Sequence, residues 1–417
     1  MGNPGCGDAP RGRAQTRAGC AAASRARGGR LPSPDVEETK STGAPRLHRR
    51  NWAGAAAVGL GGSVLRLGVL AGIGAANDER LGDLLNKWDA EYYTQIAAHG
   101  YFDAQIAGGG PAYEKTLAFF PGFPLLLRAG HALTGVHYST LAVVLNLALT
   151  VVLAAGAMAL ANRVALSCGA APGYGYRLAA AAVVTGAPMA IVFAMPYTEA
   201  LFGALAIWAL VALWDRRWPA AAALVFCLGL VRLTAVDMLA AFALAVLFYG
   251  RRQWSAWAGL AVSVVPLVAY LAWANSHLTA VGGYFGTQRK HWNSGFDGGL
   301  ASLRWVATSL TSAENAGFLL TTAVMLAAPL CLVLAWRRIG LAPWWFSAAL
   351  MVNVLASDGI MHSRPRLLLP AVIVVLPLLV SGFRRLPGWV MGLLVALWVL
   401  FGAWFSAYML AVFEWAI

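Results

Sequence analysis

One stretch near the start of the chain, residues 87–101, places a carboxylate among aromatic side chains in a sequence that is otherwise mostly aliphatic. Four of its side chains share one face if the stretch is helical, because they follow one another at i, i+3, i+4 and i+7: Asp89, Tyr92, Tyr93 and Ile96. Asp89 stands where a helix N-cap would stand, and Gly100 where a C′ glycine would stand. The pattern predicts a short amphipathic helix with a carboxylate at its entrance and aromatic rings on its flank.

Two roles are open to Asp89. A side-chain oxygen at the start of a helix commonly accepts a hydrogen bond from the backbone, so Asp89 can be a cap and nothing more. A carboxylate among aromatic rings can also act in acid/base chemistry on a bound substrate. The segments that surround residues 87–101 help to decide between the cap role and the acid/base role.

The composition is that of a polytopic membrane protein. Of the 417 residues, 59% are hydrophobic and 12% are charged, whereas soluble domains carry about twice that charged fraction. Many apolar runs reach the roughly 20 residues that a helix needs to cross a bilayer. The predicted fold class is therefore an all-α polytopic membrane protein.

The net charge of +13 does not indicate a nucleic-acid partner, because the basic residues lie mainly in an N-terminal tail and in short loops between apolar segments. The five cysteines show no spacing that is typical of a metal site or a disulfide framework. We expect no metal and no cofactor.

Eleven apolar segments are expected to span the membrane: residues 52–74, 139–161, 177–195, 197–214, 218–232, 234–249, 254–275, 316–336, 341–360, 366–383 and 388–413. Clusters of arginine separate them: Arg46/Arg49/Arg50, Arg163/Arg177, Arg216/Arg217, Arg251/Arg252, Arg337/Arg338 and Arg384/Arg385. With eleven spans all of these clusters fall on one side, and outside the tail Asp215 is the only acid placed with them. The positive-inside rule then predicts a cytoplasmic N-terminus and an exterior C-terminus.

This topology predicts how the chain is divided. Residues 1–50, rich in Arg, Gly, Ala and Pro, are expected to form a disordered basic cytoplasmic tail, and residues 51–417 a transmembrane domain. Two long segments, about 75–138 and 276–315, fall on the exterior side and are rich in aromatic residues. Loops of this length are usually functional or disordered, and their aromatic content favours function.

Ionisable residues in or beside membrane spans are functional candidates, because a charge in the membrane is costly. Six of them converge on the exterior face, where the Asp89 helix is also expected: Glu199, Arg232, Asp237, Asp358, Arg364 and Arg366. Each also has a structural alternative. Arg232 can pair with Asp237, and Glu199 can cap a helix. Arg364 and Arg366 can reach lipid headgroups. Taken together, carboxylates and arginines beside aromatic loops suit acid/base work on a phosphate-bearing substrate.

Several motifs carry a resemblance to a known family. The most specific are Trp88-Asp89-x-x-x-Tyr93-x-x-Ile96-Ala97-x-x-Gly100-Tyr101 and Ala118-Phe119-Phe120-Pro121-x-Phe123-Pro124-Leu125. Looser ones follow in order: Pro196-Tyr197-Thr198-Glu199-Ala200-Leu201-Phe202, Arg232-Leu233-Thr234, Tyr284-Phe285-x-x-Gln288-x-x-x-Trp292 and Arg366-Leu367-Leu368-Leu369-Pro370. Over about residues 85–385 the chain resembles the PIG-V family of mannosyltransferases. It departs from the family pattern where Leu233-Thr234 follows Arg232, and where Ser363-Arg364-Pro365-Arg366 carries an extra arginine and a proline.

The resemblance implies a GT-C-like glycosyltransferase in the cell membrane with a helical first exterior loop. Such an enzyme moves a sugar, here a mannosyl residue, from a polyprenyl-phosphate donor to a lipid or glycan acceptor on the exterior face, with inversion. By the same resemblance Asp89 stands where the catalytic base is expected. The residues expected to bind substrate are Trp88, Tyr92, Tyr93, His99, Phe119, Phe120, Tyr197, Glu199, Arg232, Asp237, Gln288, Trp292, Arg364 and Arg366.

Two other classes of membrane protein remain as alternatives. A transporter or flippase of a lipid-linked sugar also needs charges in the outer half of the membrane, but its usual signs are repeated halves and midplane sites. The sequence shows no such repeat. A structural or assembly protein would leave the clustered charges unexplained.

Overall fold

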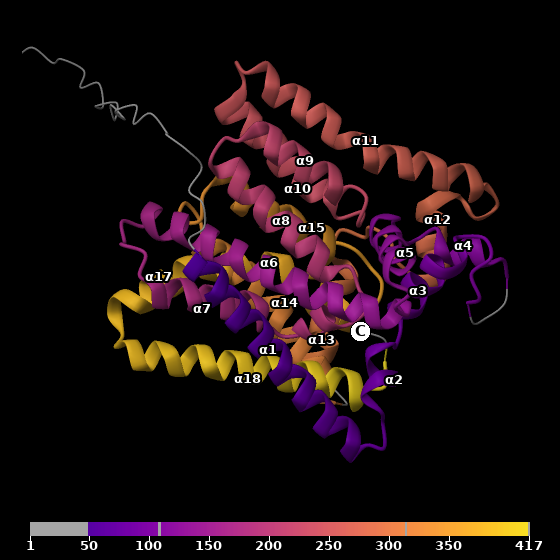
Figure 1. Cartoon of the computed structure of the whole chain (residues 1–417), viewed down its shortest axis with the longest axis horizontal. Helices are drawn as coiled ribbons and strands as arrows, with labels where there is room; N and C mark the ends of the chain where they lie inside the picture. Colours follow the sequence, from indigo (N-terminus) through magenta and orange to yellow (C-terminus); the bar gives the residue numbers. More distant parts are fainter. Residues whose placement is uncertain (1–48, 107–109, 313–314, 416–417) are drawn as a thin grey trace, which may run out of the picture. The chain divides into compact units, whose positions relative to one another are not determined.

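The computed structural model describes residues 49–106, 110–312 and 315–415, so the tail expected over residues 1–50 lies almost wholly outside the described residues. The described part of the chain is helical, with one isolated β-bridge between Phe296 and Ser357. Figure 1 shows the arrangement of these helices.

The α-helices, in chain order, are α1 (Arg49–Ala76), α2 (Leu81–Leu85), α3 (Asp89–His99), α4 (Ala112–Thr116), α5 (Gly122–Thr134), α6 (Tyr138–Ser167), α7 (Tyr174–Thr185), α8 (Glu199–Trp214), α9 (Trp218–Leu228), α10 (Ala235–Ala245), α11 (Trp254–His277), α12 (Gly283–Trp292), α13 (Leu300–Ser312), α14 (Ala316–Leu334), α15 (Leu341–Leu355), α16 (Arg364–Leu367), α17 (Leu376–Arg385) and α18 (Gly388–Ala411). Shorter 3-10 or π-helical segments are η1 (Ala190–Ala194), η2 (Val246–Gly250), η3 (Thr279–Val281), η4 (Met361–Ser363) and η5 (Leu369–Val375).

Five of the described helices are long and apolar enough to cross a membrane: α1, α6, α11, α14 and α18. A sixth candidate is the pair Met361–Leu367 and Leu369–Arg385, which is bent by 62°. The apolar helices α8, α9, α10 and α15 are shorter. The chain is therefore a multi-pass membrane protein, whereas the expected count of eleven spans is not confirmed.

The segment expected to span at residues 177–195 is not a single helix. α7 ends at Thr185, and only the 3-10 turn η1 follows it. Pro188 lies in the gap, and proline both lacks a backbone N–H and disfavours helix at the residue before it. The carbonyl groups that a helix end leaves unpaired need other donors. Arg66 of α1, which is fully buried, supplies one by donating to the Thr185 carbonyl at 2.5 Å.

The segment expected at residues 366–383 is also wrong as a single helix, since α16, η5 and α17 divide it. Pro370 and Pro377 stand at the starts of η5 and α17, where a missing N–H costs least. The segment expected at 341–360 ends early, at Leu355, and an irregular connection leads to η4. Hydropathy finds apolar runs but does not show where prolines interrupt the helix within them.

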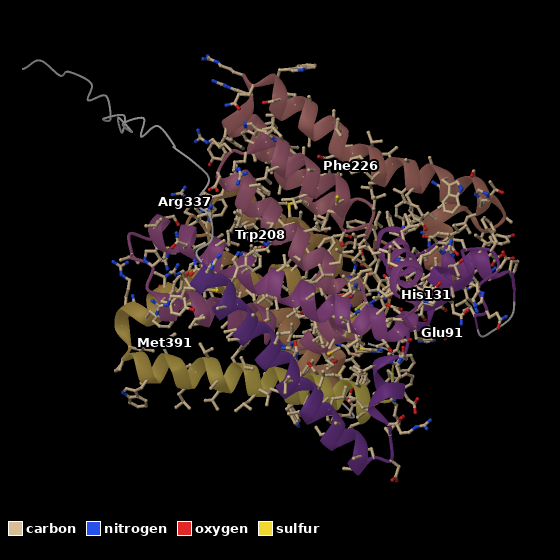
Figure 2. All side chains as sticks on the ribbon, in the orientation of Figure 1. Glu91, His131, Trp208, Phe226, Arg337 and Met391 are labelled. Carbon is tan, nitrogen blue, oxygen red and sulfur yellow. The ribbon has the colours of Figure 1, made fainter. Side chains whose placement is uncertain are left out.

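Basic residues from three of the clusters, Arg163, Arg338 and Arg384, lie together at one end of the helical body. Arg163 forms an ion pair with Asp215 at 2.5 Å. The Cys168 carbonyl accepts from Arg384 at 3.1 Å, and the adjacent Ser167 hydroxyl donates to the Arg338 carbonyl at 3.0 Å. Figure 2 shows Arg337, from the same cluster as Arg338, far from Glu91 on α3. The expected grouping is thus present for these three clusters, at the end remote from α3.

The connecting segments at the other end fold into short helices, with α3, α4, α5 and α12 close together (Figure 1). Lys290 of α12 forms an ion pair with Glu114 of α4 at 2.7 Å. The hydrogen bond from Lys290 is the main cause that lowers the pKa of the Glu114 carboxyl below its usual value. The Tyr284 hydroxyl of α12 also donates to the Ala118 carbonyl at 3.1 Å. These contacts fix α12 against the segment that contains α3.

The close approach of α18 to the break after α7 yields a stability prediction. A Cβ at Gly402 would stand 2.1 Å from the Gly186 carbonyl oxygen, so Gly402→Ala must push backbone apart. We expect this substitution to destabilise the protein by about 1–3 kcal/mol. Gly392→Ala is the matched control on the same helix, since a Cβ there meets no atom within 4 Å and alanine favours helix. Thermal unfolding midpoints of the purified variants measure both, and a wild-type midpoint for Gly402→Ala would contradict the packing.

Candidate active site

A cavity of about 520 Å³ opens where α3, α12 and α16 meet the connections α4–α5, α9–α10 and α15–η4. Most of the residues expected to form a site line it: Trp88, Asp89, Tyr92, Tyr93, Phe119, Phe120, Arg232, Gln288, Trp292, Arg364 and Arg366. Asp358, a further candidate, also lines it. Tyr197, Glu199 and Asp237 do not line the cavity but contact residues that do. His99 is exposed at the end of α3 and lies outside the lining.

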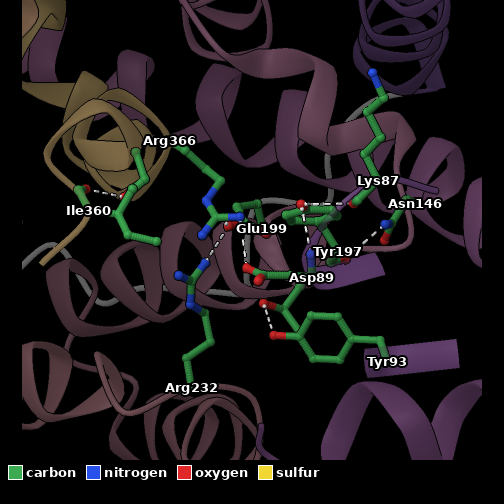
Figure 3. Close-up of polar contacts among 11 residues, drawn as sticks. Lys87, Asp89, Tyr93, Asn146, Tyr197, Glu199, Arg232, Ile360 and Arg366 are labelled. Carbon is green, nitrogen blue, oxygen red and sulfur yellow. Dashed lines mark hydrogen bonds and ion pairs between the residues drawn. The ribbon is translucent and has the colours of Figure 1, made fainter. Parts of the chain in front are cut away.

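Asp89 is the first residue of α3, and the expected cap role is wrong. Trp88 is the N-cap residue, and no side chain caps this helix end. The Asp89 carboxylate instead accepts a hydrogen bond from Arg366, with 2.8 Å between Oδ2 and Nη1 (Figure 3). Within the described residues its other oxygen, Oδ1, has no partner, and 24% of the side chain is exposed. One oxygen is therefore held while the other is available to a ligand.

A chain of alternating charges extends from Asp89 into the protein. Arg366 also approaches Glu199, with 3.5 Å between Nε and Oε1. Arg232 donates to the same Glu199 oxygen at 2.7 Å. Glu199 and Arg366 are both buried. Two carboxylates and two guanidinium groups neutralise one another, which makes the burial of each charge tolerable.

The chain of charges corrects two of the structural alternatives. Arg232 pairs with Glu199 rather than with Asp237, whose carboxylate accepts from Asn353 at 3.3 Å. Glu199 does not cap α8, because its carboxylate binds the two arginines and Thr198 holds the cap position. Pairing across the bundle depends on which helices meet, and nearness along the sequence does not reveal this.

Arg364 is the cavity-lining cation that has no carboxylate within ion-pair distance in the described parts of the chain. Its Nη2 donates to the Ser357 carbonyl at 2.6 Å, and its buried Nε has no hydrogen-bond partner there. Only 4% of Arg364 and 8% of Arg366 is exposed, so neither reaches out to lipid headgroups as the alternative proposed. A buried guanidinium N–H without a partner suits an anionic ligand.

Aromatic rings form another part of the wall. Tyr92 and Phe119 stack with 4.6 Å between ring centroids and 15° between planes. Trp292 of α12 meets Phe119 edge-on at 5.7 Å. The Tyr93 ring also meets Phe119 edge-on, with 5.1 Å between ring centroids. Such a surface, with polar groups nearby, is typical of pockets that bind small organic ligands.

The sequence analysis did not identify some of the residues that line the cavity or support its lining. Asn353 lines the cavity and holds Asp237, and Asn146 of α6 donates to the Tyr197 carbonyl at 2.8 Å. Both are amides inside apolar runs, and polar residues in such runs are expensive and often functional. That signal was present for both. Ser294 and Gly295 also line the cavity, but their surroundings in the sequence give no comparable signal.

Comparison with known proteins gives a family match, short matches to curated relatives and a structural match. The family model "Mannosyltransferase (PIG-V)" matches residues 65–250. GPI alpha-1,6-mannosyltransferase 2 of Rattus norvegicus and of Homo sapiens are each 48% identical over 46 residues, which is 11% of this chain and only 7% of each relative's length. The crystal structure of ArnT from Cupriavidus metallidurans bound to undecaprenyl phosphate aligns with a TM-score of 0.46 and 13% identity, over 84% of this chain and 75% of that one.

The family match covers Asp89 and Arg232, which line the cavity, and Glu199, which pairs with Arg232. It also covers both of the motifs that are most specific in the sequence. The resemblance predicted from those motifs is confirmed over residues 65–250, which match the model of the PIG-V family of mannosyltransferases.

Proposed function

We propose that the protein is a membrane glycosyltransferase that moves a mannosyl residue from a polyprenyl-phosphate donor to a hydroxyl of a lipid or glycan acceptor. The observation that carries this proposal is the Asp89 carboxylate, with Oδ2 held by Arg366 and Oδ1 available at the cavity. The family match over residues 65–250 supports the same reaction class.

The reaction is a displacement at the anomeric carbon. The acceptor oxygen forms a bond to that carbon and gives its proton to Asp89. The bond from the carbon to the donor phosphate oxygen breaks, and the phosphate leaves with the electron pair. A single displacement inverts the anomeric centre. Arg366 keeps the carboxylate in one orientation, which favours a near-attack geometry for the acceptor.

Arg364 is suited to bind the donor phosphate. It is the cavity-lining arginine that has no carboxylate within ion-pair distance in the described residues, and its Nε is buried without a partner. Guanidinium groups bind phosphate oxygens through two parallel hydrogen bonds. Arg366 and Arg232 form ion pairs with Asp89 and Glu199 respectively, so in this proposal they orient the base and balance the charge beside it.

The cavity faces the exterior in this proposal. Basic residues of three of the clusters lie together at the end of the helical body remote from α3. Basic loops are retained on the cytoplasmic side of membranes. The cavity at the opposite end then opens outward, and its aromatic wall of Tyr92, Phe119 and Trp292 is available to the rings of the sugar substrates.

Asp89→Asn tests the base. Asparagine retains an oxygen that can accept from Arg366, and Glu199 remains as a counter-ion for that arginine, so the protein should fold and insert. An amide does not accept the proton, so turnover should fall by about 10²- to 10⁴-fold with little change in the donor KM. Steady-state transfer kinetics of the purified variant measure the effect.

Glu91→Gln is the matched control, because Glu91 is an exposed acid of the same helix and lies outside the cavity lining. Its turnover should match the wild type. Near-normal turnover in well-folded Asp89→Asn would remove Asp89 as the base.

Arg364→Lys tests the phosphate contact. Lysine keeps the charge but does not reproduce the planar fork of hydrogen bonds, so the donor KM should rise by about tenfold or more while folding is retained. Arg289→Lys on α12 is the control, since Arg289 is exposed and lies outside this cavity. Equal donor KM values for the two variants would exclude Arg364 as the phosphate ligand.

Reporter fusions test the orientation. Fusions after Arg217, Arg252, Arg338 and Arg385 should read as cytoplasmic, because each follows a basic cluster. A fusion within residues 286–298 should read as exterior. A cytoplasmic reading at residues 286–298 would place the cavity on the wrong side for the proposed reaction.

A further inference from the structure

The residue before Asp89 has an unusual backbone. Trp88 has φ 62° and ψ −122°, and it is one of few non-glycine residues with positive φ in the described parts of the chain. Turns normally assign this conformation to glycine, because a Cβ is strained there. The surroundings must therefore supply the free energy that keeps Trp88 in place.

The Tyr197 hydroxyl bridges the two peptide groups that flank Trp88. Its oxygen accepts from the Asp89 backbone N–H at 3.2 Å, and its O–H donates to the Lys87 carbonyl at 3.3 Å (Figure 3). Tyr197 is 1% exposed and lies outside the cavity lining. The sequence resemblance had suggested a substrate contact for it, but these contacts are with the backbone that carries Asp89.

Tyr197 is itself held from two sides. Asn146 of α6 donates its amide to the Tyr197 carbonyl at 2.8 Å. The guanidinium of Arg366 lies 5.1 Å from the centre of the Tyr197 ring, a cation–π distance. Because the same guanidinium binds the Asp89 carboxylate, Tyr197 and Arg366 hold Asp89 at its backbone and at its side chain respectively.

We infer that Tyr197 is a positioning residue, which acts by holding the strained turn at residues 87–89 and so aims the Asp89 carboxylate. This inference rests on the proposed role of Asp89 as the base. It assigns Tyr197 no contact with either substrate. Loss of the hydroxyl should let Trp88 relax and should misplace the carboxylate while leaving donor binding intact.

Tyr197→Phe tests the inference, since phenylalanine keeps the ring against Arg366 and removes both hydrogen bonds. The first readout is hydrogen–deuterium exchange of the peptide covering residues 87–93, which does not need turnover. Exchange at the Asp89 amide should become about tenfold faster. Tyr176→Phe is the matched control, because Tyr176 is also buried and its hydroxyl donates to a backbone carbonyl, that of Leu376, outside the cavity.

The second readout is transfer kinetics. Tyr197→Phe should lower kcat by about 10- to 100-fold and leave the donor KM unchanged. In an Asp89→Asn background the same substitution should cause no further loss, because it acts only through Asp89. A purely structural role would reduce turnover by the same factor in both backgrounds. Tyr176→Phe should change neither kcat nor KM.

Unchanged exchange, unchanged kcat or an additive loss in the Asp89→Asn background would each overturn the inference. Absence of any transfer by the wild-type protein would overturn the proposed function instead. Exchange would then decide by itself whether Tyr197 holds the turn.

Discussion

The site depends on one buried guanidinium, that of Arg366, which lies between the carboxylates of Asp89 and Glu199. A buried arginine with no counter-ion would be costly, and either carboxylate without the arginine would be costly as well. Arg232 completes the charge balance at Glu199. The four side chains come from α3, the start of α8, the α9–α10 connection and α16, so their pairing ties together segments that are far apart in the chain.

Irregular backbone within the helical body makes this arrangement possible. The segment between α7 and α8 turns at residues 186–198 and thereby brings Tyr197 to the backbone of Asp89 and Glu199 to the guanidinium of Arg366. Backbone groups freed at such breaks need partners where lipid offers none. Arg66 and Asn146 provide them, through hydrogen bonds to the carbonyls of Thr185 and Tyr197. Polar residues deep in apolar helices thus support the shape of the site from outside its lining.

The sequence predicted the elements better than their pairing. The periodicity around Asp89 predicted α3 and its glycine terminus, and the motifs identified most of the cavity lining. The cap role failed because Trp88 takes a conformation that no propensity favours for tryptophan. The partner of Arg232 depends on helix packing, which periodicity along one helix does not contain. The breaks that divide residues 177–195 and 366–383 have another cause: they lie at prolines within apolar runs, and hydropathy does not distinguish such a run from a continuous helix.

In the proposed reaction the Asp89 carboxylate, held by Arg366 at this cavity, serves sugar transfer from a polyprenyl-phosphate donor. The purified wild-type protein is reconstituted in vesicles with radiolabelled polyprenyl-phosphate mannose and a membrane lipid extract as the source of acceptor. The distribution of the radiolabel between donor and product is then measured. The label should leave the donor and appear in a new lipid- or glycan-linked product. Recovery of all the label on chemically unaltered donor, whether or not the donor had crossed the bilayer, would contradict the proposed reaction.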